Sequence, residues 1–208
     1  MDRLWLYPDQ GRSSVTPIYL MMGYVFFGLF SPGPNVVLLT SSGARFGFRA
    51  TLPHILGVAL GVGIIAGLTG AGIGALLLAM PSLMLVLKLI ASAWILWMAW
   101  GLWQARPVTR RDTGARPFTF VEAVLFQAVN PKIWVVALGA AVYVSDFAPI
   151  EQATLLAMAF SGINFFVCLF WTWAGTLLSM LLNNPAAWRI FMRIMAIALA
   201  GFSLAVFL

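Results

Sequence analysis

Charge is the scarcest property of this 208-residue sequence. Only 9% of the residues are charged and only six are acidic, whereas 62% are hydrophobic. A soluble domain usually carries about 25% charged residues, so this composition excludes an ordinary water-soluble protein. A helix that spans a bilayer needs about 20 mostly apolar residues, and the chain therefore has room for about six such helices and little else.

Cysteine and histidine are rarer still, because Cys168 and His54 are the only residues of their kinds. One cysteine excludes a disulfide framework or a thiolate metal cluster within the chain. We therefore expect no metal and no cofactor, and an enzyme is disfavoured because no acid–base pair falls within an apolar segment. Residues 1–16 are polar and lack the apolar core of a cleavable signal peptide, so the first helix must direct insertion.

The hydropathy pattern predicts an all-α integral membrane protein with six transmembrane helices. They form a single domain, residues 17–208, that follows a short polar N-terminal tail at 1–16. The expected helices cover residues 17–41, 52–79, 82–104, 119–144, 150–180 and 186–207. Thr119 and Glu122 have the spacing of a capping box at the start of the fourth helix. Asn184 followed by Pro185 is typical of the N-cap and first turn of the sixth.

The formal net charge of +6 would suggest a nucleic-acid partner in a soluble protein, but here the arginines lie in short loops between apolar segments. Lysine and arginine in such loops mark the cytoplasmic side of a membrane protein. The first, third and fifth loops contain arginine, whereas the second is uncharged and the fourth is acidic. We therefore expect no nucleic-acid partner, a cytoplasmic loop at 105–118 and both termini outside.

Two proline motifs interrupt the predicted helices at corresponding places. The first is Ser31-Pro32-Gly33-Pro34-Asn35 in the first helix, and the second is Asn130-Pro131-Lys132 in the fourth. Proline frees backbone carbonyl groups, which are tolerated at membrane depth only where they are buried or line a cavity. Each motif opens a set of three helices, so the two sets would insert in opposite orientations. This pattern predicts a 3+3 inverted repeat with broken first and fourth helices, and a substrate site between the breaks.

Three polar side chains outside the first motif are further candidates. Lys132 lies near mid-membrane, where an unpaired charge is expensive, so a functional or paired role is favoured. Asn164 in the fifth helix either binds ligand or hydrogen-bonds a neighbouring helix. Glu122 is the only carboxylate close to a membrane segment that could carry a proton, although the capping box alone explains it. Glycine pairs in the second helix indicate close packing within the chain, with a homodimer interface as the alternative.

Together these features resemble the LysE/RhtB superfamily of amino-acid exporters, and the resemblance covers nearly the whole chain after residue 17. The resemblance rests on the order and spacing of several motifs. They are the two proline motifs, Gly43-Ala44-Arg45-Phe46-Gly47, the glycine-rich helix from Gly57, and the stretch from Leu87-Lys88-Leu89 to Trp100-Gly101. Two departures stand out. Asn35 replaces the aspartate of many relatives, and the family's proline-glutamine-phenylalanine is absent around Tyr143-Val144-Ser145.

The resemblance implies a multi-pass protein of the bacterial or archaeal inner membrane that exports small amino acids, driven by an ion gradient, with membrane lipid around it. The family's motifs fall on Pro32, Gly33 and Pro34 and on Asn130, Pro131 and Lys132. The full set of candidates for substrate binding or gating is Ser31, Pro32, Gly33, Pro34, Asn35, Asn130, Pro131, Lys132 and Asn164, with Glu122 as the candidate for proton coupling. Neutral substrates are favoured over basic ones, because a cationic side chain would need a buried anion. An exporter or channel for another small solute is the alternative; a membrane enzyme or a structural subunit is less favoured.

Overall fold

A computed structural model describes residues 15–105, 116–181 and 184–205 of the chain. Most of the polar tail expected at 1–16 and most of the loop expected at 105–118 lie outside these residues, while Val15 and Thr16, expected in the tail, already belong to the first helix. Within them the secondary structure is helical, without strands. The elements are α1 (Val15–Phe30), α2 (Pro34–Phe46), α3 (Phe48–Gly70), α4 (Ile73–Leu78), α5 (Pro81–Trp103), α6 (Phe120–Val129), α7 (Pro131–Ala141), the 3₁₀ helix η1 (Val142–Val144), α8 (Pro149–Leu181) and α9 (Pro185–Ala205).

Four of the described helices are long and apolar enough to cross a membrane, and two bent helix pairs bring the total to as many as six spans. The first pair joins α1 to α2 at an angle of 56°, and the second joins α6 to α7 at 66°. The bends fall at the two proline motifs. The predicted fold class, an all-α membrane protein with broken first and fourth helices, is therefore confirmed.

Three predicted helix ends were wrong. The first segment was expected to end at residue 41, but α2 continues to Phe46. The second was expected to run from 52 to 79, but α3 starts at Phe48 and ends at Gly70. A turn follows, in which Gly72 adopts a positive φ of 95° that other residues rarely tolerate. Apolar residues on both sides of this turn, including those of the short helix α4, conceal it from a hydropathy profile.

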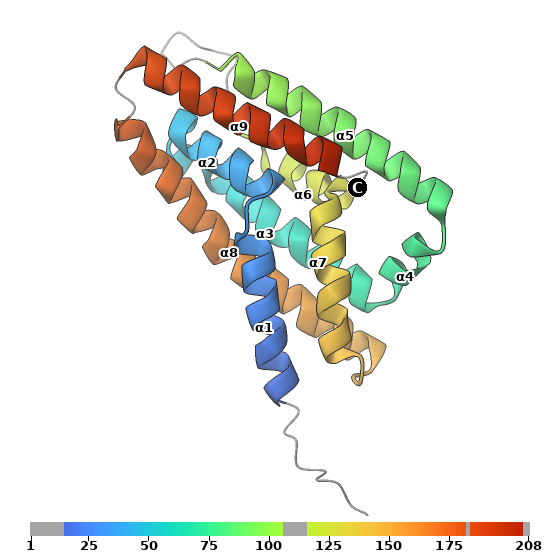
Figure 1. The fold of residues 1–208 in the computed structure, drawn as a ribbon. Coiled ribbons are helices and arrows are strands. Elements are labelled where there is room, and N and C mark those ends of the chain that lie inside the picture. Colours follow the sequence, from blue (N-terminus) through green and yellow to red (C-terminus); the bar gives the residue numbers. More distant parts are fainter. Residues whose placement is uncertain (1–14, 106–115, 182–183, 206–208) are drawn as a thin grey trace, which may run out of the picture.

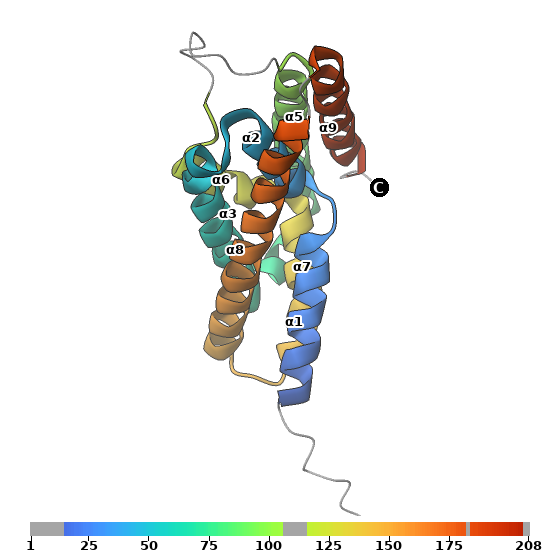
Figure 2. The same ribbon diagram turned by 90° about the vertical axis from the view of Figure 1, so that its left-hand side faces the viewer.

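The helix contacts follow the pattern of an inverted repeat. In such a repeat α1, α2, α3 and α5 correspond to α6, α7, α8 and α9, in this order, and the short helix α4 has no counterpart. The structure pairs α3 with α8 and α5 with α9. It packs α2 on α8 and also α7 on α3, which is the equivalent contact in the other repeat. Likewise α6 packs on α3 and α1 on α8. Figures 1 and 2 show α1 and α7 side by side, with α5 and α9 together at one end of the molecule.

Small residues allow α3 to approach its neighbours closely. A Cβ atom added to Gly57 would lie 2.7 Å from the Cβ atom of Ala123 in α6, and one added to Gly61 would lie 2.8 Å from Cγ of Gln127. On the other face of α3, a Cβ atom at Gly67 would lie 3.2 Å from the Cβ atom of Ala157 in α8. The glycines of the second span therefore serve packing within the chain, as their spacing indicated.

Candidate functional site

Proline positions the start of each second half-helix at the two breaks. Pro34 and Pro131 occupy the first turn of α2 and α7, where the missing N–H group costs no intrahelical hydrogen bond. Gly33 precedes α2 in an extended conformation, with φ of −177°, and Asn130 precedes α7 with φ of −77° and ψ of 102°. The chain thus changes direction twice near the centre of the molecule, leaving backbone carbonyl groups outside the helical ladder.

The Lys132 side chain joins the two breaks. Its Nζ atom donates hydrogen bonds to the Ser31 carbonyl oxygen at 2.5 Å, to Ser31 Oγ at 3.0 Å and to the Pro32 carbonyl oxygen at 3.2 Å. An ammonium group has three N–H donors, so these contacts use all of them. The oxygens follow the C-terminus of α1, where the helix dipole is negative and favours a cation. Lys132 of α7 therefore satisfies the carbonyl groups that the first proline motif frees.

Gly33 makes room for this contact. A Cβ atom at Gly33 would lie 2.8 Å from both Cδ and Nζ of Lys132. Because the φ of Gly33 is extended and open to any residue, the glycine is needed here for space and not for its backbone freedom. The glycine of the first motif and the lysine of the second therefore fit each other.

An amide pair forms a second link between the repeats. Asn35 Nδ2 donates to Gln127 Oε1 at 2.8 Å, and Gln127 Nε2 donates back to Asn35 Oδ1 at 3.2 Å and to the Ala123 carbonyl oxygen at 2.9 Å. Asn130 Nδ2 also donates to Gln127 Oε1, at 3.4 Å. Gln127 is fully buried, and the sequence analysis did not name it as a site residue. It lies three residues before Asn130, about one helical turn away, and this spacing could have indicated that the two side chains meet.

A small cavity lies where the breaks meet α8. Its volume is about 10 Å³, which is close to what one water molecule needs. An amino acid therefore does not fit without a change of conformation. Both breaks and α8 supply its lining, which consists of Leu29, Gly33, Asn35, Val36, Leu39, Asn130, Lys132, Ile133, Asn164, Val167, Cys168 and Trp171.

Three polar atoms of residues that line this cavity lack a hydrogen-bond partner among the described residues. They are Asn130 Oδ1, Asn164 Nδ2 and Trp171 Nε1. Asn130 and Asn164 are only 1% and 2% exposed, so these groups have lost water without gaining a partner. Unsatisfied buried polar groups are costly and mark sites of ligand or ordered water. The residues around the cavity thus hold one unpaired acceptor and two unpaired donors.

Trp171 is the second residue that the sequence analysis missed. It follows Asn164 by seven residues on α8, two helical turns, and therefore lies on the same face of the helix. Its ring lies 5.3 Å from the ring of Phe30, the last residue of α1. Tryptophan in an apolar run of a membrane protein carries little sequence signal by itself, and only the spacing from Asn164 distinguished this one.

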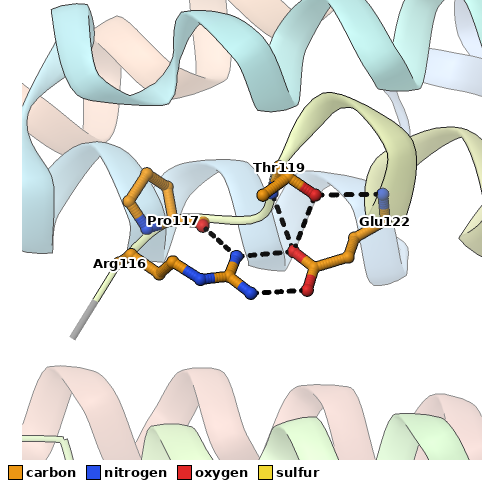
Figure 3. A network of polar contacts seen from close by, with 4 residues as sticks. All are labelled: Arg116, Pro117, Thr119 and Glu122. Carbon is orange, nitrogen blue, oxygen red and sulfur yellow. Dashed lines mark hydrogen bonds and ion pairs between the residues drawn. The ribbon is translucent and has the colours of Figure 1, made fainter. Parts of the chain in front are cut away.

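Glu122 lies elsewhere, at the start of α6 (Figure 3). The predicted capping box is confirmed, because Glu122 N donates to Thr119 Oγ1 at 3.2 Å and Thr119 N donates to Glu122 Oε2 at 2.8 Å. Arg116 donates to both carboxylate oxygens at 2.7 Å, and these hydrogen bonds raise the pKa of its guanidinium. Glu122 is absent from the residues that line the small cavity. The hydrogen bonds of Glu122 are therefore those of a helix-capping residue.

A larger cavity of about 260 Å³ lies at the arginine-containing end of the molecule, between α2, α3 and α5. Ser41, Arg45, His54, Trp97 and Arg116 are among the residues that line it. His54 is 2% exposed, and its ring lies 5.2 Å from the ring of Phe118 at an interplanar angle of 37°. This cavity is large enough for a small amino acid and is separate from the one at the breaks.

The structure thus brings most of the predicted site residues together. Ser31, Pro32 and Lys132 share hydrogen bonds, while Gly33, Asn35, Asn130 and Asn164 line the cavity with Lys132. Pro34 and Pro131 contribute through the backbone, by starting α2 and α7. The described residues contain no group of three or more histidine, cysteine or acidic side chains that could hold a metal ion.

Comparison with known proteins relates the chain to bacterial efflux proteins. It is 33% identical over 122 residues to a cysteine/O-acetylserine efflux protein of Shigella flexneri serotype 5b, covering 57% of this chain and 62% of the relative. It is 32% identical over 111 residues to the Escherichia coli K12 protein of the same name, covering 53% and 56%. The chain therefore spans about three fifths of the length of these relatives.

A membrane protein of Vibrio cholerae is 32% identical over 126 residues, 58% of this chain and 60% of that protein. No solved structure gives a significant match. The model of the LysE type translocator family matches residues 26–208, which include both proline motifs, the cavity between them and every span after the first half-helix. The chain is therefore a multi-pass membrane protein that belongs to the LysE type translocator family, a family of translocators and not of enzymes.

Proposed function

We propose that this protein exports a small neutral amino acid from the cytoplasm across the inner membrane, driven by an ion gradient. The observation that supports this most is the cavity between the two breaks, where Asn130, Asn164 and Trp171 present polar atoms without partners beside the Lys132 ammonium. Discontinuous helices with free backbone groups near the midplane are the substrate sites of many inverted-repeat transporters.

The chemistry of the cavity suits a zwitterion. Asn164 Nδ2 and Trp171 Nε1 are donors that suit a carboxylate, while Asn130 Oδ1 and the carbonyl groups of the first break suit an ammonium group. Among residues 15–105, 116–181 and 184–205, those that line the cavity include no aspartate or glutamate. A substrate with a cationic side chain would leave that charge unpaired at membrane depth, which is why we favour neutral substrates.

The names of the relatives agree with this substrate class. Cysteine and O-acetylserine, for which the Shigella and Escherichia proteins are named, are both small amino acids with uncharged side chains at neutral pH. The larger cavity lies among Arg45, Arg116 and His54, at the end of the molecule that we expect to face the cytoplasm because its loops contain arginine. We propose that it receives the substrate before the cavity at the breaks opens.

Efflux from proteoliposomes tests this function directly. Vesicles loaded with radiolabelled cysteine, O-acetylserine or arginine are diluted into label-free buffer, with and without an imposed proton or sodium gradient. We expect gradient-dependent loss of the two neutral amino acids and little loss of arginine. Asn164→Leu, which keeps the number and branching of the side-chain heavy atoms but removes the amide, should slow efflux at least tenfold.

Ser203→Ala is the matched control for Asn164→Leu. Ser203 is equally buried at 2% exposure and forms its hydrogen bonds with Ser92, between α9 and α5 and away from the cavity. Efflux by this variant should stay within twofold of wild type. Equal rates for the Asn164 variant and wild type would place substrate binding elsewhere, and arginine efflux as fast as cysteine efflux would refute the preference for neutral substrates.

A further inference from the structure

Building on the proposed function, we propose that the oxygens of the first break form an ammonium-binding subsite that Lys132 fills in the closed conformation. A zwitterionic substrate then inserts between Lys132 and these oxygens. Its ammonium group takes the three positions that the Lys132 side chain now holds, and its carboxylate becomes the new partner of Lys132. The subsite consists of the Ser31 and Pro32 carbonyl oxygens and Ser31 Oγ.

The first step of the argument is the geometry of the oxygens. All three lie within 3.2 Å of one nitrogen atom, which is the arrangement that any –NH₃⁺ group requires. Two of them are backbone carbonyl groups held in place by the proline motif, and the third, Ser31 Oγ, is oriented by the hydrogen bond that it donates to the Gly28 carbonyl oxygen at 2.9 Å. They also follow the C-terminus of α1, where the helix dipole adds to the attraction of a cation.

The second step concerns the charge of Lys132. Its hydrogen-bond partners are neutral, and the described residues that line the same cavity include no acidic one. The described carboxylate nearest in sequence, Glu122, is paired with Arg116 at the start of α6. Within the part of the chain that the structure describes, the lysine is held by dipoles alone, so a substrate carboxylate offers its ammonium group a stronger partner than it has in the closed conformation.

The third step is the balance of partners after insertion. The substrate ammonium group replaces that of Lys132 at the oxygens, and the carboxylate binds Lys132 together with Asn164 Nδ2 and Trp171 Nε1, which now lack partners. An amine without a carboxylate would leave Lys132 unpaired, and an acid without an ammonium group would leave the oxygens unpaired. Both are expensive in a membrane interior, so the site should require both groups on one molecule.

The fourth step links binding to movement. Lys132 belongs to α7 and the oxygens belong to the junction of α1 and α2, so their contact joins one repeat to the other. Insertion of a substrate must separate these elements, and it would enlarge a cavity that now holds about one water molecule. Substrate binding would thus release the link that keeps the two breaks together, without any covalent step.

Thermal unfolding of the purified protein in detergent tests the subsite without transport. Lys132→Ala removes the resident ammonium group and leaves the oxygens. About 100 mM methylammonium chloride should then raise the unfolding temperature of the variant by about 2–4 °C and leave wild type unchanged. Tetramethylammonium, which has the same charge but no N–H donor, is the matched probe and should not stabilise either protein.

A second measurement uses the wild-type protein, so that a poorly folded variant does not decide the matter. Cysteine or serine should raise its unfolding temperature, whereas the N-acetyl derivative, which lacks the ammonium group, and the amino-acid amide, which lacks the carboxylate, should not. Equal stabilisation by the N-acetyl derivative would overturn the ammonium subsite. So would the failure of methylammonium to stabilise a monodisperse Lys132→Ala protein.

These outcomes are separate from those of the efflux assay. If no amino acid is exported but methylammonium selectively stabilises Lys132→Ala, the subsite stands and the proposed function falls. If neutral amino acids are exported but neither stabilisation experiment shows a requirement for an ammonium group, the function stands and the exchange with Lys132 is wrong.

Discussion

Replacement of Gly33 by alanine provides the sharpest test of the contact between the two breaks. The new Cβ atom would lie 2.8 Å from Cδ and Nζ of Lys132, whereas ordinary contacts of this kind are 3.4–4 Å. The lysine must therefore withdraw by about 1 Å, which stretches hydrogen bonds that are now 2.5, 3.0 and 3.2 Å long. Hydrogen bonds between membrane helices average about 0.6 kcal/mol and reach about 1.7 kcal/mol. Loss of all three would cost about 2–5 kcal/mol.

The assay is thermal unfolding of detergent-purified protein, followed by size-exclusion chromatography. A loss of this size should lower the midpoint by at least about 4 °C. Gly23→Ala in α1 is the matched control, because a Cβ atom there meets nothing within 4 Å. It should leave the midpoint unchanged or raise it slightly, since alanine favours a helix more than glycine does.

A double-mutant cycle assigns the effect to the lysine. In a Lys132→Ala background the atoms that the new methyl group would strike are gone, so Gly33→Ala should cost little there. The reasoning fails if Gly33→Ala is as harmless as Gly23→Ala. It also fails if the cost is the same with and without Lys132, because the φ of −177° at Gly33 offers no backbone strain to explain it.

Three further predictions address other parts of the molecule. Reporter fusions after Thr113 should read cytoplasmic and fusions after Asp146 external, and the reverse at both sites would invert the orientation. Glu122→Gln should keep both the capping box and efflux, because glutamine also accepts from the Thr119 amide; loss of efflux in a folded variant would instead support a proton-carrying role. Gln127→Leu should reduce efflux more than tenfold while the protein stays monodisperse, because it leaves the Asn35 amide without its partner; unchanged efflux would show that this amide pair does not shape the site.

Features set by local sequence were predictable. Proline and glycine dictated where the two spans bend, and the spacing of Thr119 and Glu122 dictated the capping box. Asn184 likewise accepts a hydrogen bond from the Ala186 amide at 2.7 Å, as its position before Pro185 indicated. Each of these depends on contacts within a few residues, which is the range over which sequence alone determines geometry.

Features set by tertiary contacts were not predictable. The hydropathy pattern predicted that the first segment ends at residue 41, but Ser41 Oγ donates to the Val37 carbonyl oxygen of its own helix and Ser42 Oγ lies 3.0 Å from Thr51 Oγ1. These contacts hide the hydroxyl groups and let α2 continue. Gln127 and the partners of Lys132 were missed for a similar reason, since their contacts join helices about 90 to 100 residues apart in sequence.

The position of Cys168 makes its thiol a native reporter of whether the cavity between the breaks is open. It is the only cysteine in the sequence, it is 1% exposed, and it lines the cavity between the breaks. The unmodified chain is therefore already a single-cysteine protein, and accessibility can be followed without engineering. A small membrane-permeant thiol reagent should label Cys168 slowly in the closed conformation and faster whenever the breaks separate, so that its labelling rate measures the fraction of time the cavity is open.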